Sequence, residues 1–364
     1  MRLLVVTNDY PPKPGGIQQY LSGFLAAFPG TVRVLAPADG PADQTALGES
    51  VVRRFSRSFM WPTPAVRKWA LEQAMEFQPD VILFGAPYPL PFLGPALREA
   101  TGAPFVVLCH GAEVTLPAAL PVARQLLAKA LKAADARIAV SRFTAGRVER
   151  LTGERVDYVG AGVDLEAFAF DRDKGGFSDP PVVACVSRFV PRKGQERLIE
   201  AAELLARRGQ PVQLLIVGKG RTEQRLRKAA AESGIDVRFE VDVPWSRLGE
   251  LYGGADLFCM PCRSRWGGLE VEGLGLVFLE AAATGLPVIA GDSGGSPETV
   301  DPGVTGHVVH DVEDIASAIS SIVADETAAR IMGVAGRRWV EQEFTWERTM
   351  ERAMEVFERV VSNG

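Results

Sequence analysis

Short apolar runs alternate with helix-like segments along the whole chain. The apolar run Val182–Val186 precedes the amphipathic segment Glu196–Arg208, and the next run, Leu214–Val217, precedes the segment Glu223–Ser233. Continuous apolar runs are typical of strands buried on both faces, as in parallel sheets covered by helices. The alternation therefore predicts a doubly wound α/β architecture. The strands predicted in this way are Leu3–Thr7, Val32–Ala36, Val81–Phe84, Phe105–Cys109, Ile138–Val140, Val182–Val186, Leu214–Val217, Val237–Phe239, Leu257–Met260, Val288–Ala290 and His307–Val309.

The length of the chain indicates two domains, because 364 residues are too many for one ordinary hydrophobic core. The stretch Phe170–Pro181 is charged and rich in glycine and proline, as linkers often are. We therefore expect two Rossmann-like domains, residues 1–170 and 171–345, that face each other across a cleft. The amphipathic segment Trp346–Val361 has no strand after it. Residues 346–364 are expected to form a helix that packs back on the first domain.

Composition and charge argue against several classes of protein. Hydrophobic residues make up 47% of the chain and charged residues 23%, as in folded globular proteins. The net charge of −5 argues against a general nucleic-acid-binding protein. No apolar run approaches the ~20 residues that span a bilayer, and the N-terminal run is too short for a signal peptide. Cys259 and Cys262 lack the second pair that a zinc site needs. We expect a cytoplasmic protein without a metal cofactor.

Among the glutamates of the segment GGLEVEGLGLVFLE, which covers residues 267–280, the candidate site residues are Glu272 and Glu280. The second of them, Glu280, lies in an apolar stretch from Leu276 to Ala283 that predicts a buried helix, where a carboxylate is costly without a partner. If the segment is helical throughout, Glu272 and Glu280 are about 12 Å apart. That span suits a nucleotide-sugar. The alternative is a loop leading into a core helix that tolerates one glutamate.

A basic loop follows the predicted strand Val182–Val186. Arg188 offers a planar fork and Lys193 a point charge, which together suit a diphosphate. Two fixed cations can stabilise a departing nucleotide diphosphate without a metal ion. The alternative is a pair of solvated surface charges. Ligands bind at the carboxyl ends of strands in such sheets, which favours the functional interpretation.

Strand ends in the first domain also carry candidate residues. Gly15 and Gly16 open a helix after the first strand, where backbone amides can approach a phosphate. His110 follows the strand Phe105–Cys109, where it can donate a hydrogen bond to a sugar hydroxyl or relay a proton. A structural role for this histidine is the alternative.

A partial dinucleotide fingerprint appears in the second half of the chain. Gly218-Lys219-Gly220 follows a strand but lacks the third glycine, and Glu240 lies about twenty residues further on, where a ribose-binding acid would stand. An NAD-dependent oxidoreductase is therefore an alternative. It leaves the loop with Arg188 and Lys193 unexplained.

Together these loops resemble the family 4 retaining glycosyltransferases of GT-B fold, and the resemblance covers nearly the whole chain. It implies that Arg188 and Lys193 bind the donor diphosphate and that Glu280 binds the ribose. It also implies that Glu272 faces the transferred sugar, with His110 nearby. The further donor-binding positions implied are Gly16, Gly218, Gly273, Leu274, Gly275, Leu276 and Val277. The segments that carry the resemblance are Pro11–Gly16, Gly162–Asp164, Ser187–Gly194, Glu272–Glu280, Ser293–Val300 and Phe344–Trp346.

Within that family the chain most resembles the GDP-mannose-dependent phosphatidylinositol monomannoside mannosyltransferases of actinobacteria. The resemblance rests on Cys185–Gln195, Gly267–Glu280, Ala290–Gly295 and Trp61–Pro64. It implies transfer of mannose from GDP-mannose to a hydroxyl of a phosphatidylinositol mannoside-like glycolipid. The implied mechanism is front-face attack with retained configuration and no cofactor.

Two further alternatives stay open at this point, and a third, a GT-A transferase, is discounted. The same chemistry can use a UDP- or ADP-sugar donor with a soluble or another glycolipid acceptor. A protein of this fold can also bind a sugar nucleotide without catalysis. A metal-dependent GT-A transferase would need an Asp-x-Asp motif after a strand, and Asp171-Arg172-Asp173 has the spacing but lies in the predicted linker.

The region Val51–Trp69 mixes arginines with aromatic residues, for example Arg53, Arg57 and Trp61. Basic and aromatic residues together suit an anionic membrane surface, where each basic group adds about 1 kcal/mol. The region therefore predicts a peripheral contact with the inner face of the plasma membrane. A strand and a helix with solvated arginines are the alternative.

Overall fold

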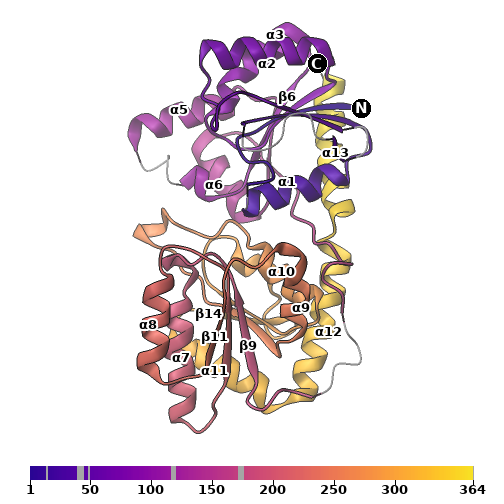
Figure 1. Ribbon diagram of the computed structural model, residues 1–364. Helices are drawn as coiled ribbons and strands as arrows, with labels where there is room; N and C mark the ends of the chain where they lie inside the picture. Colours follow the sequence, from indigo (N-terminus) through magenta and orange to yellow (C-terminus); the bar gives the residue numbers. More distant parts are fainter. Residues whose placement is uncertain (14, 39–44, 48–49, 116–119, 171–175, 364) are drawn as a thin grey trace. The chain divides into compact units, whose positions relative to one another are not determined.

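The computed structural model describes residues 1–13, 15–38, 45–47, 50–115, 120–170 and 176–363 (Figure 1). Its contacts divide the chain into two compact units. Unit 1 comprises Met1–Gly162 with Trp346–Gly364, and unit 2 comprises Val163–Thr345. The boundary between the units follows Gly162, whereas the boundary predicted from the sequence follows residue 170. Most of the predicted linker, residues 171–175, lies outside the described residues.

Unit 1 contains an eight-stranded sheet in its described part, with strand order β3-β4-β2-β1-β5-β6-β7-β8. All neighbouring strands are parallel except β3, which pairs antiparallel with β4. The order reverses between β1 and β5. The strands are β1 (Arg2–Val6), β2 (Thr31–Ala36), β3 (Thr45–Leu47), β4 (Ser50–Arg54), β5 (Val81–Phe84), β6 (Phe105–Cys109), β7 (Ala136–Ala139) and β8 (Asp157–Tyr158). The helices are α1 (Gly16–Ala26), α2 (Pro64–Phe77), η1 (Leu90–Leu93), α3 (Gly94–Thr101), α4 (Ala112–Thr115), α5 (Pro121–Lys132), α6 (Arg142–Thr152) and α13 (Trp346–Asn363).

The last helix, α13, belongs to unit 1 although unit 2 precedes it in the chain. It packs against α1 and β7. The ring of Trp346 meets the ring of Tyr20 edge-on, with 5.3 Å between the centroids. Gly162 lies so close that a Cβ there would stand 2.4 Å from the Trp346 nitrogen. The predicted return of the C-terminal helix to the first domain is confirmed.

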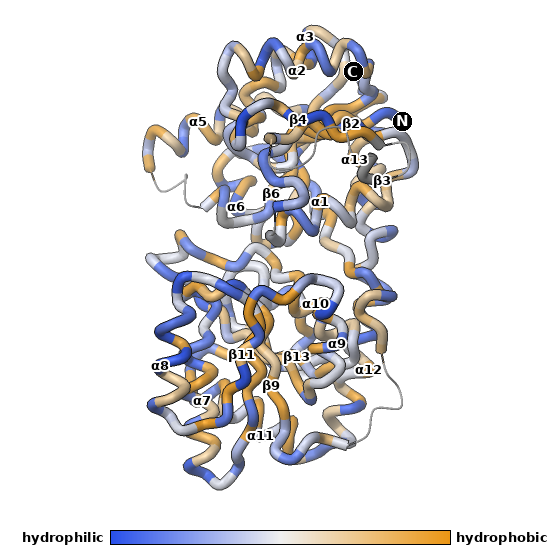
Figure 2. Tube along the Cα trace, viewed as in Figure 1, coloured by the Kyte–Doolittle hydropathy of each residue, from blue (hydrophilic) through white to orange (hydrophobic). Residues whose placement is uncertain are grey.

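Unit 2 contains a six-stranded parallel sheet with the order β11-β10-β9-β12-β13-β14. This order reverses between β9 and β12, and such a switch point is where doubly wound sheets bind ligands at the carboxyl ends of the strands. Figure 2 shows the central strands in the hydrophobic colour. The strands are β9 (Val182–Val186), β10 (Gln213–Val217), β11 (Val237–Glu240), β12 (Leu257–Met260), β13 (Val288–Gly291) and β14 (Gly306–Val309). The helices are η3 (Pro191–Lys193), α7 (Gln195–Arg207), α8 (Glu223–Ser233), η4 (Trp245–Arg247), α9 (Leu248–Gly253), η5 (Trp266–Gly268), α10 (Leu276–Ala283), η6 (Ser296–Thr299), α11 (Val312–Ala324) and α12 (Glu326–Glu343).

Every strand predicted from the sequence coincides with or overlaps a strand of the structure, and both main sheets are parallel as predicted. Two strands, β3 and β8, were not predicted, and β4 with the following helix α2 corresponds to the alternative given for Val51–Trp69. Among the described helices, none has the length and apolar content needed to cross a membrane.

Candidate active site

The loop that follows β9 is held against its neighbours by backbone contacts. The Ser187 nitrogen donates to the Val217 carbonyl at 3.0 Å. Gly194 has a φ of +78°, and a Cβ there would stand 2.1 Å from the carbonyl oxygen of Pro261, in the loop after β12. Only glycine allows this approach without strain. The contact brings η3 to the switch point between β9 and β12, and it buries the side chains of Arg192 and Lys193.

These two cations share one carboxylate, that of Glu272. Lys193 Nζ lies 2.7 Å from Glu272 Oε2, and Arg192 Nη1 lies 2.5 Å from the same oxygen. The three side chains are only 9–11% exposed. Burial by itself would raise the pKa of Glu272, but the charges of Lys193 and Arg192 outweigh it and lower the pKa to about 2. Glu272 is therefore ionised at neutral pH and well suited to accept hydrogen bonds.

Arg188, the other predicted diphosphate ligand, has a different environment. Its side chain is exposed, and no ion pair joins it to a residue in the described part of unit 2. Arg188 is thus available to an incoming anion, whereas Lys193 pairs with the carboxylate of Glu272. Two residues of the cluster, Arg192 and Glu270, were not predicted as site residues. Glu270 pairs with Arg265 at 2.9 Å.

Glu272 lies in a loop and not in a helix. Helix α10 begins only at Leu276, because Gly275 has a φ of +94° at the position before it. The loop is fixed by a hydrogen bond from the Gly295 nitrogen to the Glu272 carbonyl at 3.0 Å. The assumption of one continuous helix from Glu272 to Glu280 is therefore wrong, and the spacing of about 12 Å derived from it does not apply. The predicted buried helix over Leu276–Ala283 is confirmed.

The start of α10 offers backbone donors to an anion. No side chain caps this helix. The first amides of a helix lack partners within the helix, and its dipole favours negative charge at that end. Within the predicted donor-binding segment Gly273–Val277, Leu276 and Val277 form this helix start, and Gly273, Leu274 and Gly275 lead into it. These positions were predicted only through the resemblance to the family 4 glycosyltransferases.

Glu280 is buried inside α10 and is held by a tyrosine that the sequence did not indicate. Tyr252 Oη donates a hydrogen bond to Glu280 Oε2 at 3.0 Å. Burial raises the pKa of Glu280 to about 7, although the hydrogen bond from Tyr252 and the charge of Lys193 oppose this. Tyr252 itself is fully buried. Tyr252 lies in the short helix α9. No motif or spacing in the sequence indicates its contact with Glu280.

Glu280→Gln is expected to stabilise the protein at pH 8 and to remove one source of pH dependence. The pKa of this carboxyl rises from 4.5 to about 7 on folding. The folded state therefore binds more protons between these values, and stability falls as the pH rises through that window. At 1.36 kcal/mol per pKa unit, the gain at pH 8 is up to about 3 kcal/mol. Thermal unfolding at pH 4 and pH 8 measures it, with Glu232→Gln on the surface as the control. An equal pH dependence in both variants would contradict the prediction.

Gly218 has a clear structural constraint in addition to its predicted donor role. Its φ is +140°, and a Cβ would stand 2.0 Å from the Ser187 carbonyl oxygen. The neighbouring Glu240, which a dinucleotide site would use for ribose, pairs instead with Arg238. The close approach of two backbones accounts for Gly218, so the partial fingerprint adds nothing in favour of a dinucleotide.

The predicted residues of unit 1 lie at the carboxyl edge of its own sheet. Gly16 opens α1, and a Cβ there would meet no atom within 4 Å. His110 is buried at the end of β6, with Nε2 at 3.0 Å from the Gly85 carbonyl oxygen. Burial lowers the pKa of His110, which favours a neutral imidazole at pH 7. That Gly16 and His110 act on the same ligand as the residues of unit 2 stays a prediction.

Among the described residues, no group of three or more His, Cys, Asp or Glu side chains is placed to hold a metal ion. The Asp-x-Asp motif, residues 171–173, lies outside them. Cys259 and Cys262 are both buried free thiols.

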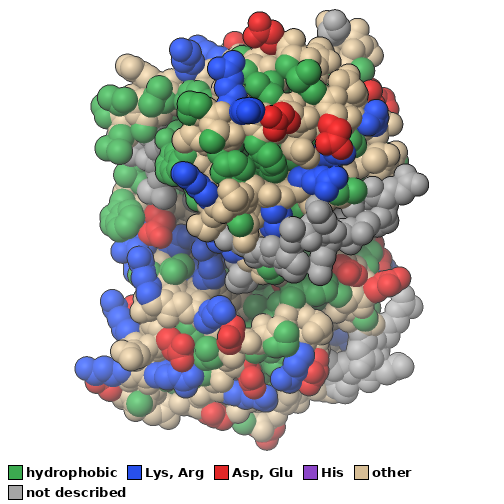
Figure 3. Space-filling view, turned by 45° about the horizontal axis from the view of Figure 1, so that its top comes forward, with side chains coloured by type: hydrophobic (Ala, Val, Ile, Leu, Met, Phe, Trp, Pro, Cys, Tyr) green, Lys and Arg blue, Asp and Glu red, His purple; other side chains and the backbone are tan. Residues whose placement is uncertain are grey.

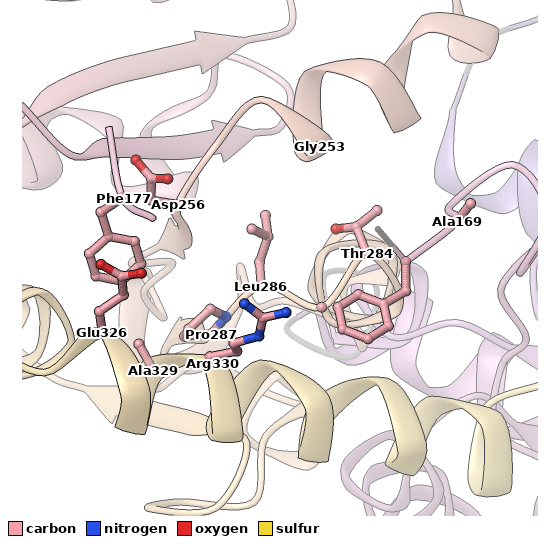
Figure 4. Close-up of a pocket in the computed structure, with 12 residues that line it drawn as sticks. Ala169, Phe177, Gly253, Asp256, Thr284, Leu286, Pro287, Glu326, Ala329 and Arg330 are labelled. Carbon is pink, nitrogen blue, oxygen red and sulfur yellow. The ribbon is translucent and has the colours of Figure 1, made fainter. Parts of the chain in front are cut away.

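A cavity of about 90 Å³ opens at the opposite edge of the unit 2 sheet (Figure 4). Its lining includes Asp256 and Pro287, which directly precede β12 and β13. It therefore lies at the amino edge, far along the strands from the switch point. Phe170, Phe177 and Leu286 give it an apolar wall. None of the predicted site residues lines it.

Two family models together match most of the chain. Residues 14–167 match the model described as Glycosyltransferase Family 4. Residues 167–339 match the model described as Glycosyl transferases group 1.

Known bacterial enzymes are similar to the chain over nearly its whole length. The GDP-mannose-dependent alpha-(1-6)-phosphatidylinositol monomannoside mannosyltransferase of Mycolicibacterium smegmatis is 40% identical over 373 residues, which cover 97% of each chain. The GDP-mannose-dependent monoacylated alpha-(1-6)-phosphatidylinositol monomannoside mannosyltransferase of Corynebacterium glutamicum is 38% identical, over 98% of each chain.

Solved structures share the fold at lower identity. Sucrose-phosphate synthase from Thermosynechococcus elongatus matches with a TM-score of 0.83 over 100% of both chains, at 22% identity. HepE of Anabaena in complex with UDP and glucose matches with a TM-score of 0.79 over 99% of this chain and 100% of its own, at 20% identity. These matches confirm the predicted fold of two Rossmann-like domains.

Proposed function

The chain belongs to the family 4 glycosyltransferases, and on that premise we propose that it transfers mannose from GDP-mannose to a phosphatidylinositol mannoside-like glycolipid. The observation that carries the proposal is the identity of 38–40% over nearly the whole chain to enzymes named for that reaction. The proposal extends the donor and acceptor of those relatives to this chain.

The charges at the switch point of unit 2 support a nucleotide-diphosphate donor. Arg188 is exposed there, Lys193 stands at the buried edge of the same loop, and the uncapped start of α10 provides amides. A diphosphate placed among these groups would meet two cations and a helix dipole of the right sign. When the sugar bond breaks, the same groups stabilise the charge that develops on the leaving diphosphate.

In this proposal Glu272 and Glu280 bind the donor and do not exchange protons with it. Glu272, with its pKa near 2, stays a carboxylate and accepts hydrogen bonds from the hydroxyls of the transferred sugar. Glu280, held by Tyr252 at 3.0 Å, accepts hydrogen bonds from the ribose. The attacking hydroxyl approaches on the face that the leaving group vacates, so the configuration is retained, and the leaving phosphate takes the proton. No metal is needed for these steps.

A thermal-shift panel tests the donor. GDP-mannose is expected to raise the unfolding temperature more than UDP-glucose or ADP-glucose at equal concentration, because a ligand at 100 times its Kd stabilises the folded state by about 2.7 kcal/mol. A larger increase in unfolding temperature with a UDP- or ADP-sugar would show that this sugar nucleotide, and not GDP-mannose, is the donor. Binding without hydrolysis or transfer would indicate a sugar-nucleotide-binding protein instead of an enzyme.

Product analysis tests the acceptor and the metal independence. Incubation with GDP-mannose and phosphatidylinositol monomannoside should yield one added mannose in α-linkage, with unchanged activity in the presence of EDTA. Inverted configuration would exclude the proposed mechanism. Loss of activity with EDTA that a divalent cation restores would show that the transfer requires a metal ion, contrary to the proposal.

A further inference from the structure

The membrane contact predicted from Val51–Trp69 is only partly available on the surface of unit 1. The guanidinium of Arg54 donates to the Pro37 and Pro11 carbonyls. Met60 is fully buried. Phe59 and Trp61 remain exposed, at 39% and 51%, with their ring centroids 5.0 Å apart. Arg57, Arg67 and Lys68 are exposed as well, so this region contributes an aromatic pair and basic residues but not the whole predicted patch.

A second apolar surface, which the sequence did not indicate, lies on helix α5. Its inner face packs into unit 1 through Leu127 and Leu131, both fully buried. On the outer face Val122 is 70% exposed and Leu126 is 43% exposed. These two residues are four apart, so they lie on one side of the helix. Leu120, directly before the helix, is 65% exposed.

The same helix carries only positive charge. Arg124, Lys129 and Lys132 are all exposed, and none of them forms an ion pair with a residue in the described part of the chain. The sequence contains no Asp or Glu from residue 114 to residue 134. Lys129 follows Leu126 by three positions and so lies beside it. An exposed apolar stripe next to unpaired cations is the pattern of a helix that lies in a membrane interface.

The aromatic pair and α5 are linked through η1. Trp61 contacts the ring of Tyr88, which is 38% exposed, with 6.2 Å between centroids. Tyr88 in turn contacts Phe92 in η1, at 6.2 Å, and η1 packs against α5. Figure 3 shows hydrophobic side chains gathered at the upper left, on the side of unit 1 where α5 lies, with basic side chains beside them.

We propose that the outer face of α5, together with Phe59, Trp61 and Tyr88, seats unit 1 on a bilayer that contains anionic lipid. This deepens the proposed function, since it rests on an acceptor that resides in a membrane. The charge selects the occupant: Lys129 and Lys132, unpaired cations on a helix without acidic residues, complement an anionic lipid surface. Val122 and Leu126 enter the interface, and Lys129 and Lys132 reach the headgroups.

Sedimentation with vesicles tests the surface on the full-length protein. Val122→Ser/Leu126→Ser is expected to weaken binding to phosphatidylcholine vesicles containing phosphatidylinositol by about tenfold or more. Lys129→Gln/Lys132→Gln is expected to remove the preference for these vesicles over pure phosphatidylcholine. The matched control is Ile331→Ser/Val304→Ser, which alters residues of unit 2 that are 66% and 51% exposed. Equal sedimentation of the α5 variants and the wild type, or an equal loss in the control, would overturn the proposal.

Two further measurements separate this proposal from the proposed function. The α5 variants should keep the wild-type thermal shift with GDP-mannose and the wild-type rate on a water-soluble acceptor analogue, and lose rate only on acceptor in vesicles. A variant that loses both rates while its unfolding temperature is unchanged would contradict a membrane role. If the wild type fails to bind GDP-mannose yet sediments through α5, the donor assignment fails and the membrane surface stands.

Discussion

Lys193→Met is expected to lower kcat/KM for GDP-mannose by about two to three orders of magnitude, the usual cost of removing one group that stabilises developing negative charge. Lys193 is 9% exposed and is one of two cations that hold Glu272. Its loss removes one of the two cations that we propose for the leaving diphosphate. Arg192 still pairs with Glu272, so the fold should survive, and steady-state kinetics can be measured on folded protein.

Arg188→Met provides a second test of the same assignment. Arg188 is exposed, so its replacement should leave the unfolding temperature unchanged while it lowers turnover strongly. Lys228→Met is the matched control, because Lys228 is 75% exposed and pairs with Glu232 within one helix. Near-wild-type rates in both the Lys193 and Arg188 variants would show that leaving-group stabilisation lies elsewhere.

Glu272→Gln is expected to destabilise the ligand-free protein by about 3 kcal/mol or more, because it leaves two buried cations without their carboxylate. Both Lys193 and Arg192 bond to Glu272 Oε2, and the amide that replaces it carries no charge. Denaturant unfolding measures the loss, with Glu232→Gln as the surface control.

The same variant should respond more strongly to GDP. In the wild type a diphosphate must share Lys193 with the carboxylate of Glu272, whereas in Glu272→Gln the diphosphate supplies the missing negative charge. We therefore expect a larger thermal shift with GDP than in the wild type, together with a strong loss of mannose transfer. A smaller shift with GDP would mean that the Glu272 carboxylate does not compete with the diphosphate.

The strands that the sequence revealed most clearly are apolar throughout, such as β9 and β12, and both are buried apart from the first residue of β9. Strand β4 was considered only as an alternative, because Arg53 and Arg54 end its apolar run after two valines. Strand β8 was missed because it has only two residues, Asp157 and Tyr158. Apolar runs report burial on both faces of a sheet, and strands near the sheet edge lack that signal.

The sequence predicted those candidate site residues that directly follow a strand, because the end of the strand fixes their location in the fold. Arg188 and Lys193 follow a strand, and the topology brings that strand end to the switch point. The partners of Glu272 and Glu280 were not predictable in full. Arg192 and Tyr252 reach these carboxylates through tertiary packing, and neither spacing nor periodicity encodes such contacts.

The return of α13 to unit 1 has a consequence for folding during synthesis. Unit 2, Val163–Thr345, is one uninterrupted segment inserted between two pieces of unit 1. Its ends are joined by a hydrogen bond from the Val163 nitrogen to the Phe344 carbonyl at 2.9 Å. Unit 1 cannot complete its fold until α13 has left the ribosome, although most of unit 1 is synthesised before unit 2. The usual vectorial order is therefore reversed, and the inserted unit can reach its native state before its host does.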